Sequence, residues 1–216
     1  MKIDILCSSE DHPVNAWLFG WASSLSDVHH VSILRDKTQL GTGDILFLVS
    51  CTEMIPSDLR ACYGYCIVLH ASDLPKGRGW SPHVWAVLEG ADRITVSAIT
   101  AEDRIDSGDV WAKTDFEVSP SALHDEINTS LFEAELRLMD RVIEMIEKNE
   151  TPQPQSDDQA TYYSRRTPLD SEIDPDRPIS EQFDKIRISD PERYPAYFRI
   201  RGAVFEISLR KVQDHD

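Results

Sequence analysis

Two short segments, residues 45–49 and 66–69, contain only apolar residues, and they restrict the fold more than any other feature of the sequence. A strand that is apolar on both faces is typical of the centre of a parallel sheet, because helices cover both of its sides. We therefore predict strands at residues 44–49 and 65–69. The composition of residues 2–7, 28–34 and 94–99 favours three further strands.

Helix signals alternate with these strands. Apolar residues at Val14, Leu18 and Trp21 follow a loop, a short helix is expected after Pro56, and residues 81–88 form a compact helical segment that ends before Gly90. This alternation predicts an α/β fold with a doubly wound, mostly parallel sheet.

The clearest helix is expected at residues 119–148, where apolar residues recur at three- and four-residue spacing. They are Leu123, Ile127, Leu131, Ala134, Leu138, Val142, Met145 and Ile146. A polar, proline-bearing linker follows at residue 151. We expect a domain at residues 1–150, then a linker and a small C-terminal extension at residues 151–216 with a β-hairpin formed by residues 197–201 and 203–209. The aromatic residues of this hairpin would cover either the chain's own core or a second copy in a homodimer.

Composition excludes several classes of protein. No apolar run is long enough to span a membrane, and Asp4 interrupts the N-terminal apolar residues, so we expect a cytoplasmic protein. The formal charge of −16 disfavours nucleic acid and anionic lipid as partners. The four cysteines, Cys7, Cys51, Cys62 and Cys66, lack the spacing of a metal site and are expected to be buried free thiols.

The residues that follow two of the expected strands carry the most chemistry. His70 follows the strand at 65–69, and Asp106 follows the strand at 94–99. Ligands bind outside the carboxyl ends of strands in an open α/β sheet, so we expect both side chains at that edge. An imidazole beside a carboxylate can exchange protons with a reacting group and stabilise a developing negative charge. Taken singly, His70 also fits a structural core histidine and Asp106 a turn cap.

The loop after His70 contains Lys76, Gly77, Arg78 and Gly79. Glycines let backbone amides approach a ligand closely, and two cations in an acidic protein suit a phosphate or diphosphate. A solvated surface turn is the alternative interpretation.

Three motifs in order carry a family resemblance. The run His-Ala-Ser-Asp-Leu-Pro-Lys-Gly-Arg-Gly at residues 70–79, Trp-Ala-Val-Leu-Glu-Gly at 85–90 and Asp-Ser-Gly-Asp at 106–109 together resemble the folate-dependent formyltransferases. That family includes methionyl-tRNA, glycinamide ribonucleotide and sugar N-formyltransferases. The resemblance implies a Rossmann-like catalytic domain, 10-formyltetrahydrofolate as the formyl donor and no metal. Residues 69–82 most resemble enzymes that act on nucleotide-linked amino sugars of the pseudaminic acid type.

The resemblance also implies roles for individual residues. The catalytic His and Asp of the family fall on His70 and Asp106. The expected folate-binding residues are Met54, Ile55, Pro56, Leu74 and Ile105, and the expected substrate-binding residues are Lys76, Gly77, Arg78, Trp80 and Arg165.

One position departs from the family pattern. A catalytic Asn normally stands two residues before the His, and Val68 occupies that position here. A replacement must come from the chain's three asparagines, Asn15, Asn128 and Asn149, or from a backbone or hydroxyl donor such as Ser72. Asn128, beside the core residue Ile127, is the candidate replacement, although a surface amide on a helix is the more common interpretation of such a position.

Three functions follow from the resemblance. The first is N-formylation of a nucleotide-linked amino sugar. A methionyl-tRNA formyltransferase is disfavoured, because residues 151–216 are too few and too acidic for a basic tRNA-binding domain. A folate-binding relic without catalysis is the third, and the retained His70 and Asp106 argue against it.

Overall fold

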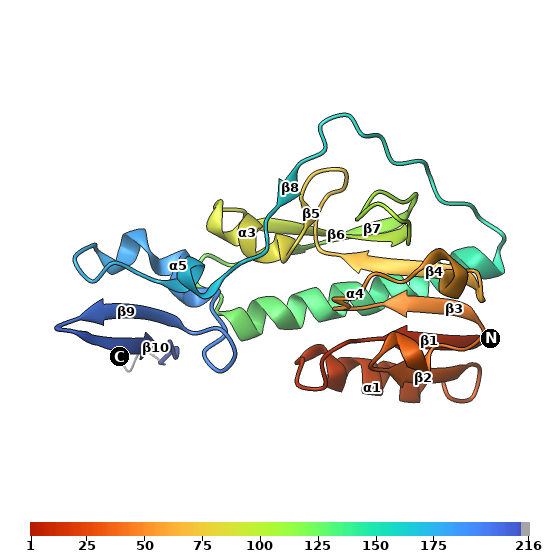
Figure 1. The fold of residues 1–216 in the computed structure, drawn as a ribbon, viewed down its shortest axis with the longest axis horizontal. Coiled ribbons are helices and arrows are strands. Elements are labelled where there is room, and N and C mark those ends of the chain that lie inside the picture. Colours follow the sequence, from red (N-terminus) through yellow and green to blue (C-terminus); the bar gives the residue numbers. More distant parts are fainter. Residues whose placement is uncertain (213–216) are drawn as a thin grey trace.

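The computed structural model describes residues 1–212. Six strands form the central sheet, in the order β2-β1-β3-β4-β6-β7 (Figure 1). Their bounds are Lys2–Leu6 (β1), His30–Leu34 (β2), Gly43–Leu48 (β3), Tyr63–His70 (β4), Arg93–Thr100 (β6) and Val110–Glu117 (β7). Strands β1 to β4 are mutually parallel, which confirms the prediction of a mostly parallel sheet.

Helices and loops cover both faces of this sheet. The larger core lies between the sheet and α1 (Val14–Ser24), α3 (Pro82–Leu88) and α4 (His124–Glu147). A smaller core on the opposite face includes Leu46, Leu48 and Ile55 and lies beside α2 (Ser57–Arg60). Strand β3 contributes to both cores, as its continuous apolar sequence predicts.

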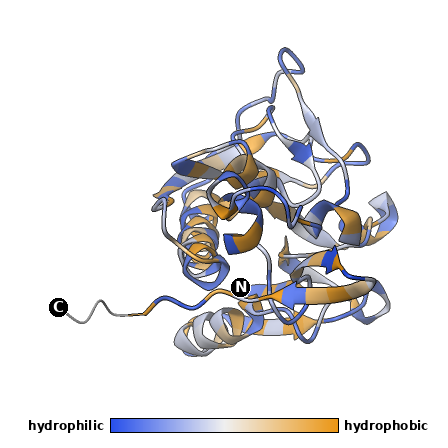
Figure 2. Cartoon of the chain, turned by 90° about the vertical axis from the view of Figure 1, so that its left-hand side faces the viewer, coloured by the Kyte–Doolittle hydropathy of each residue, from blue (hydrophilic) through white to orange (hydrophobic). Residues whose placement is uncertain are grey.

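Helix α4 packs its apolar residues on β6, β7 and α1 and turns most of its charged residues outward (Figure 2). It begins five residues later than the apolar spacing predicts. Its first turn is closed by Glu126, whose carboxylate accepts a hydrogen bond from the N–H of Leu123 at 2.8 Å. Trp21 of α1 donates to Asp140 of α4 at 2.7 Å and ties the two helices together. No helix within residues 1–212 is long and apolar enough to cross a membrane.

Strand β6 runs antiparallel to β4, contrary to the expectation that Asp106 follows a parallel strand. The reason lies in α3, whose 7 residues span only about 10 Å, whereas a strand as long as β6 spans about 26 Å. The helix therefore does not carry the chain back across the sheet, and β6 enters at the edge where β4 ends. Strand β7, which the sequence analysis missed, then pairs antiparallel with β6.

The chain after α4 returns across the molecule. It leaves the end of α4, passes above β7 and β6, and places β8 (Tyr162–Tyr163) beside β5 (Arg78–Gly79) in a parallel pair (Figure 1). Beyond it lie α5 (Phe183–Arg187) and the predicted hairpin, formed by β9 (Ala196–Ile200) and β10 (Ala203–Ile207). Short 3-10 turns occur at Lys37–Gln39, Pro168–Ser171 and Ile179–Glu181.

The hairpin is covered at its base and through Phe198. Ala196, Phe198 and Ile207 pack on Ile173 and Ile186 in a separate small core. Phe198 also stacks on Phe205, with ring centroids 5.5 Å apart, and Phe205 is exposed. The hairpin therefore covers part of the chain's own core and leaves apolar surface at its tip.

A buried polar pair at the start of the sheet provides a test of stability. The hydroxyl of Tyr63 donates to the Asp4 carboxylate at 2.7 Å, and Asp4 is 2% exposed. Burial, and then the bond to Asp4, raises the pKa of Tyr63. Tyr63→Phe removes this bond to a buried charged group and also the acceptor of the Gly41 N–H at 3.2 Å, so we expect the free energy of unfolding in urea to fall by about 2 kcal/mol.

Tyr65→Phe is the matched control. Tyr65 lies on the same strand, is exposed and packs its ring edge-on against Trp111, a contact that phenylalanine keeps. This variant should stay within about 0.5 kcal/mol of the wild type. Equal stability of Tyr63→Phe and Tyr65→Phe would show that the bond to Asp4 contributes nothing.

Candidate active site

His70 is the last residue of β4 and is 6% exposed. Its Nε2 lies 2.8 Å from the carbonyl oxygen of Gly77, and its Nδ1 lies 3.5 Å from Oδ1 of Asp106. A carbonyl oxygen only accepts hydrogen bonds, so Nε2 carries a proton. Nδ1 is then the atom at which His70 can gain or release a proton beside the carboxylate.

Asp106 reaches His70 from the loop between β6 and β7. This residue has a φ of +51°, and its Oδ2 accepts a hydrogen bond from the N–H of Gly79 at 2.8 Å. The loop turns tightly at Gly108, where a Cβ would lie 1.8 Å from the carbonyl oxygen of Thr100. The structure thus places His70 and Asp106 together, as expected, although the loop that brings Asp106 there follows an antiparallel strand.

Arg78 is placed differently from the exposed cation that the sequence predicts. It is fully buried, and its guanidinium donates to Gln155, Asp157 and the hydroxyl of Tyr162. Arg104 donates to the same Asp157 carboxylate and to Tyr162. Hydrogen bonds from Arg78 and then Arg104 lower the pKa of both Asp157 and Tyr162. Since Gln155, Asp157 and Tyr162 of the C-terminal segment accept the hydrogen bonds of its guanidinium, Arg78 is not free to bind a phosphate.

The other expected substrate-binding residues either lie near the surface or contribute a backbone group to the site. Lys76 is exposed, whereas the carbonyl of Gly77 is directed at His70. The guanidinium of Arg165 lies 4.8 Å from the ring centroid of Trp80. Lys76 and the Trp80–Arg165 pair are therefore the members of the predicted set that offer side chains to a ligand.

The expected folate-binding residues separate into two groups. Ile55 and Leu74 are buried, and Ile55 belongs to the smaller core, so its side chain is used for packing. Met54 and Ile105 are 51% and 48% exposed, and Pro56 is exposed as well. The exposed three offer apolar surface to a ligand.

Asn128 is half-buried on α4, and no hydrogen bond among residues 1–212 joins it to His70 or Asp106. Asn15 is buried and donates its amide to the carbonyls of the loop after β1, including that of Glu10 at 2.8 Å. The hydroxyl of Ser72, in contrast, is buried and has no hydrogen-bond partner. Of the candidates to replace the family Asn, Ser72 therefore has an unused polar atom two residues from His70.

Two further histidines lie at this end of the sheet and carry no sequence motif. Burial lowers the pKa of His83 to about 4, with smaller contributions from His12, His70 and Arg166. Burial, and then Arg193, lowers the pKa of His12 to about 4 as well. Both imidazoles are neutral at pH 7, so each can donate and accept a hydrogen bond.

A metal site requires several cysteine, histidine or acidic side chains close together. Residues 1–212 contain no group of three or more His, Cys, Asp or Glu side chains placed to hold a metal ion. All four cysteines are free thiols. Cys7 and Cys66 are buried, whereas Cys51 is half-buried and Cys62 is exposed, contrary to the expectation that all four are buried. Cys62 is exposed because it lies in the turn that precedes β4.

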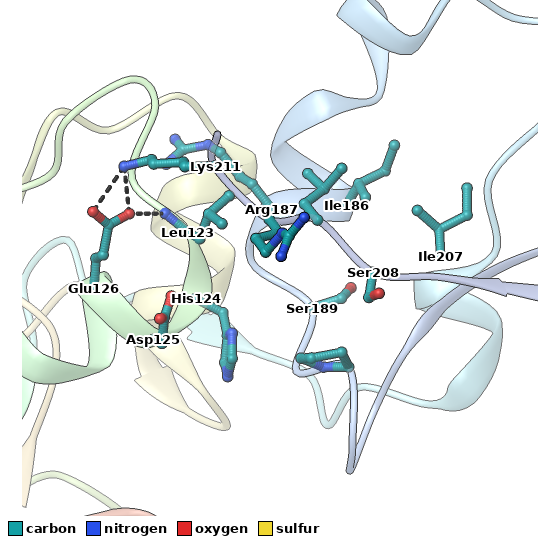
Figure 3. Close-up of a pocket in the computed structure, with 13 residues that line it drawn as sticks. Leu123, His124, Asp125, Glu126, Ile186, Arg187, Ser189, Ile207, Ser208 and Lys211 are labelled. Atoms are coloured by element: carbon teal, nitrogen blue, oxygen red, sulfur yellow. Dashed lines mark hydrogen bonds and ion pairs between the residues drawn. The ribbon is translucent and has the colours of Figure 1, made fainter. Parts of the chain in front are cut away.

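A cavity of about 360 Å³ lies where residues 207–211 pass the N-terminus of α4 (Figure 3). Residues 123–126, Ile186 and Arg187 also line it. Lys211 donates to Glu126 at 2.7 Å at its edge, and this bond lowers the pKa of Glu126. None of the predicted site residues lines this cavity, so the motifs do not point to it.

Comparison with known proteins supports the motif-based interpretation. A methionyl-tRNA formyltransferase from Sulfurihydrogenibium is 33% identical over 150 residues, covering 67% of this chain and 47% of that protein. A solved methionyl-tRNA formyltransferase from Clostridium thermocellum is 26% identical, with a TM-score of 0.83 over 99% of this chain and 94% of that one. A 4-N formyltransferase from Francisella tularensis shares the fold at 19% identity, with a TM-score of 0.79 over 99% of this chain and 98% of that one.

The chain spans about half the length of the curated relatives it matches. The sequence profile described as formyl transferase matches residues 25–143, which hold both His70 and Asp106. This match covers more than half of the chain, and the chain therefore belongs to the formyl transferase family.

Proposed function

We propose that the chain transfers a formyl group from 10-formyltetrahydrofolate to a primary amine. The observation that carries this proposal is the pair of buried His70 and half-buried Asp106 at the end of β4, with Nδ1 and Oδ1 3.5 Å apart. The folate supplies the formyl group. Met54 and Ile105 offer exposed apolar surface for its ring system, and the unpartnered hydroxyl of Ser72 offers a polar contact.

The pair suits the two demands of this reaction. Attack of the amine forms a bond to the formyl carbon and places negative charge on the formyl oxygen. When the carbonyl forms again, the bond between the formyl carbon and the folate nitrogen breaks, and the proton lost by the amine passes to that folate nitrogen. The Asp106 carboxylate lies beside Nδ1 of His70, and an imidazole in this place can stabilise that negative charge and exchange the proton. Low exposure excludes water from the pair and strengthens its electrostatic interactions.

We propose that the acceptor is a nucleotide-linked amino sugar of the pseudaminic acid type and that the chain acts in the cytoplasm. The charge of −16 disfavours a large polyanion, while Lys76 and the Trp80–Arg165 pair suit a diphosphate and a base. The fold extends over almost the whole of a 4-N formyltransferase. The division into a catalytic domain at 1–150 and an extension at 151–216, and assembly as a homodimer, remain parts of this proposal.

Methionyl-tRNA is the second candidate acceptor, because the relative at 33% identity and the solved structure at 26% identity both carry that name. The solved chain has nearly the same extent as this one, which weakens the argument from length. The C-terminal hairpin region is also locally basic, with Arg199, Arg201, Arg210 and Lys211 against Glu206.

The test is release of tetrahydrofolate from 10-formyltetrahydrofolate in the presence of single acceptors. The acceptors are UDP- and dTDP-linked amino sugars and methionyl-tRNA, with a reaction lacking acceptor as control. We expect release with one amino sugar and none with the tRNA. Release with the tRNA and with none of the sugars would replace the first candidate by the second. If the folate binds but no tested acceptor causes release above the control, formyl transfer to either class of acceptor is contradicted.

A further inference from the structure

In the segment after α4, the side chain of Gln155 contacts the backbone turn that carries Asp106 and also Arg78 in the 77–79 loop. We propose that Gln155 is a positioning residue that fixes Asp106 and the 77–79 loop around His70. This inference rests on the proposed function for the reaction it serves. Its structural part stands on hydrogen bonds alone.

One end of Gln155 holds the loop that carries Asp106. Its Nε2 donates to the carbonyl of Asp106 at 3.2 Å and to the carbonyl of Gly108 at 2.9 Å. These two carbonyls flank Ser107, so the amide fixes the turn from both sides. Asp106 itself has a left-handed backbone conformation, which costs energy in a residue other than glycine and persists only where neighbouring contacts hold it.

The other end of Gln155 holds the loop beneath His70. Its Oε1 accepts a hydrogen bond from Nε of Arg78 at 3.0 Å and a second one from Nη2. Arg78 stands between Gly77, whose carbonyl contacts His70, and Gly79, whose N–H contacts Asp106. A shift of Arg78 would therefore displace a contact of each member of the pair.

The segment after α4 also binds the 77–79 loop through Thr161. Thr161 accepts a hydrogen bond from the N–H of Gly77 at 2.8 Å through its hydroxyl, and from the N–H of Arg78 at 2.9 Å through its carbonyl. Each residue from 77 to 79 thus contacts the C-terminal segment or the Asp106 loop. Gln155 differs from Thr161 because its side chain bonds both to Arg78 and to the backbone carbonyls of the Asp106 loop. Asp157 and Tyr162 also join the two loops, but they bond to the Asp106 loop through the side chain of Arg104 and not through its turn.

This role requires an amide. Gln155 donates to two carbonyl oxygens and accepts from a guanidinium, so it needs donors at one end and an acceptor at the other. A glutamate keeps the acceptor and the shape but directs an oxygen at the two carbonyls. Gln155→Glu therefore keeps the contact with Arg78 and breaks the contact with the Asp106 loop.

Gln153→Glu is the matched control. This substitution adds the same negative charge two residues away. Gln153 is exposed, and its hydrogen bonds with Val110 use backbone atoms only. Two readouts are compared in the wild type and both variants. The first is NMR, which gives the hydrogen-exchange rate of the Gly79 amide and the chemical shifts of the His70 ring nitrogens. The second is kinetics, which gives kcat and KM for formyl transfer.

We expect Gln155→Glu to speed Gly79 exchange and to lower kcat about tenfold, with KM for the folate within about twofold of wild type and with Gln153→Glu unchanged. Unchanged exchange and His70 shifts in Gln155→Glu would overturn the proposal, as would altered exchange with an unchanged kcat. If the wild type shows no turnover with any acceptor, the proposed function fails while the NMR readout still decides whether Gln155 holds the two loops.

Discussion

His70→Ala is expected to lower kcat of formyl transfer by about 1,000-fold, because general acid–base catalysis by one side chain contributes roughly 100- to 10,000-fold. The substitution removes the imidazole from both partners, leaving Oδ1 of Asp106 and the carbonyl of Gly77 without it. KM for the folate should change little if its ring system binds at Met54 and Ile105, which do not depend on His70. The measurement is initial rate against donor concentration at a saturating acceptor.

His70→Gln separates the chemical role from the structural one. A glutamine can still donate to the Gly77 carbonyl as Nε2 of His70 does, but it cannot exchange a proton at neutral pH. Both variants should therefore lose activity, whereas His70→Gln should retain more of the wild-type stability in urea. Activity near the wild-type level in His70→Gln would refute proton exchange by His70 and leave it a structural residue.

The sequence predicts best where burial produces a repeating pattern. Residues 45–49 are apolar on both faces because β3 is central, and α4 shows its spacing because one of its faces packs on the sheet. The direction of β6 carries no such pattern, since parallel and antiparallel strands bury similar residues. Strand β7 has only a weak alternation, of Lys113, Asp115 and Glu117 with Thr114 and Phe116, and a bulge at its pairing with Ala98 and Ile99 interrupts the register.

The same distinction applies to the candidate site. His70 and Asp106 lie in motifs, so their proximity could be predicted, but the contacts that hold them could not. Gln155 lies in a polar, proline-bearing segment that resembles an ordinary linker. Arg78 lies in a glycine-rich loop that resembles a solvated turn, and its acidic partner Asp157 is 79 residues away. Such pairings follow from the path of the chain across the molecule, which single-residue patterns do not record.

Glu135 on α4 is expected to make the protein less stable as pH rises through neutrality. Its carboxyl is 5% exposed, and its Oε2 has no hydrogen-bond partner. Burial raises its pKa to about 8, from 4.5 in the unfolded chain. Between these values the folded protein binds the proton more tightly than the unfolded chain, so the free energy of unfolding falls as pH increases and levels off above the folded pKa.

Glu135→Gln removes this dependence, because the amide is nearly isosteric and does not ionise. At pH 7 the unfolded chain gains about 3 kcal/mol from releasing the proton of Glu135, so the variant should be more stable than the wild type by up to about that amount. Near pH 4.5 the two proteins should be alike. Urea unfolding of both proteins from pH 5 to pH 8 gives the difference directly, and using the difference cancels the separate effect of His12 and His83.

Those two histidines titrate in the opposite sense. Their pKa values are lowered to about 4, so the stability that they contribute is present above 6.5, their value in the unfolded chain, and is lost as pH falls toward 4. Glu133→Gln, an exposed neighbour on α4, controls for the loss of one negative charge from an acidic protein. If the free energies of unfolding of Glu135→Gln and Glu133→Gln depend on pH in the same way, then Glu135 is ionised in the folded protein and the prediction is wrong.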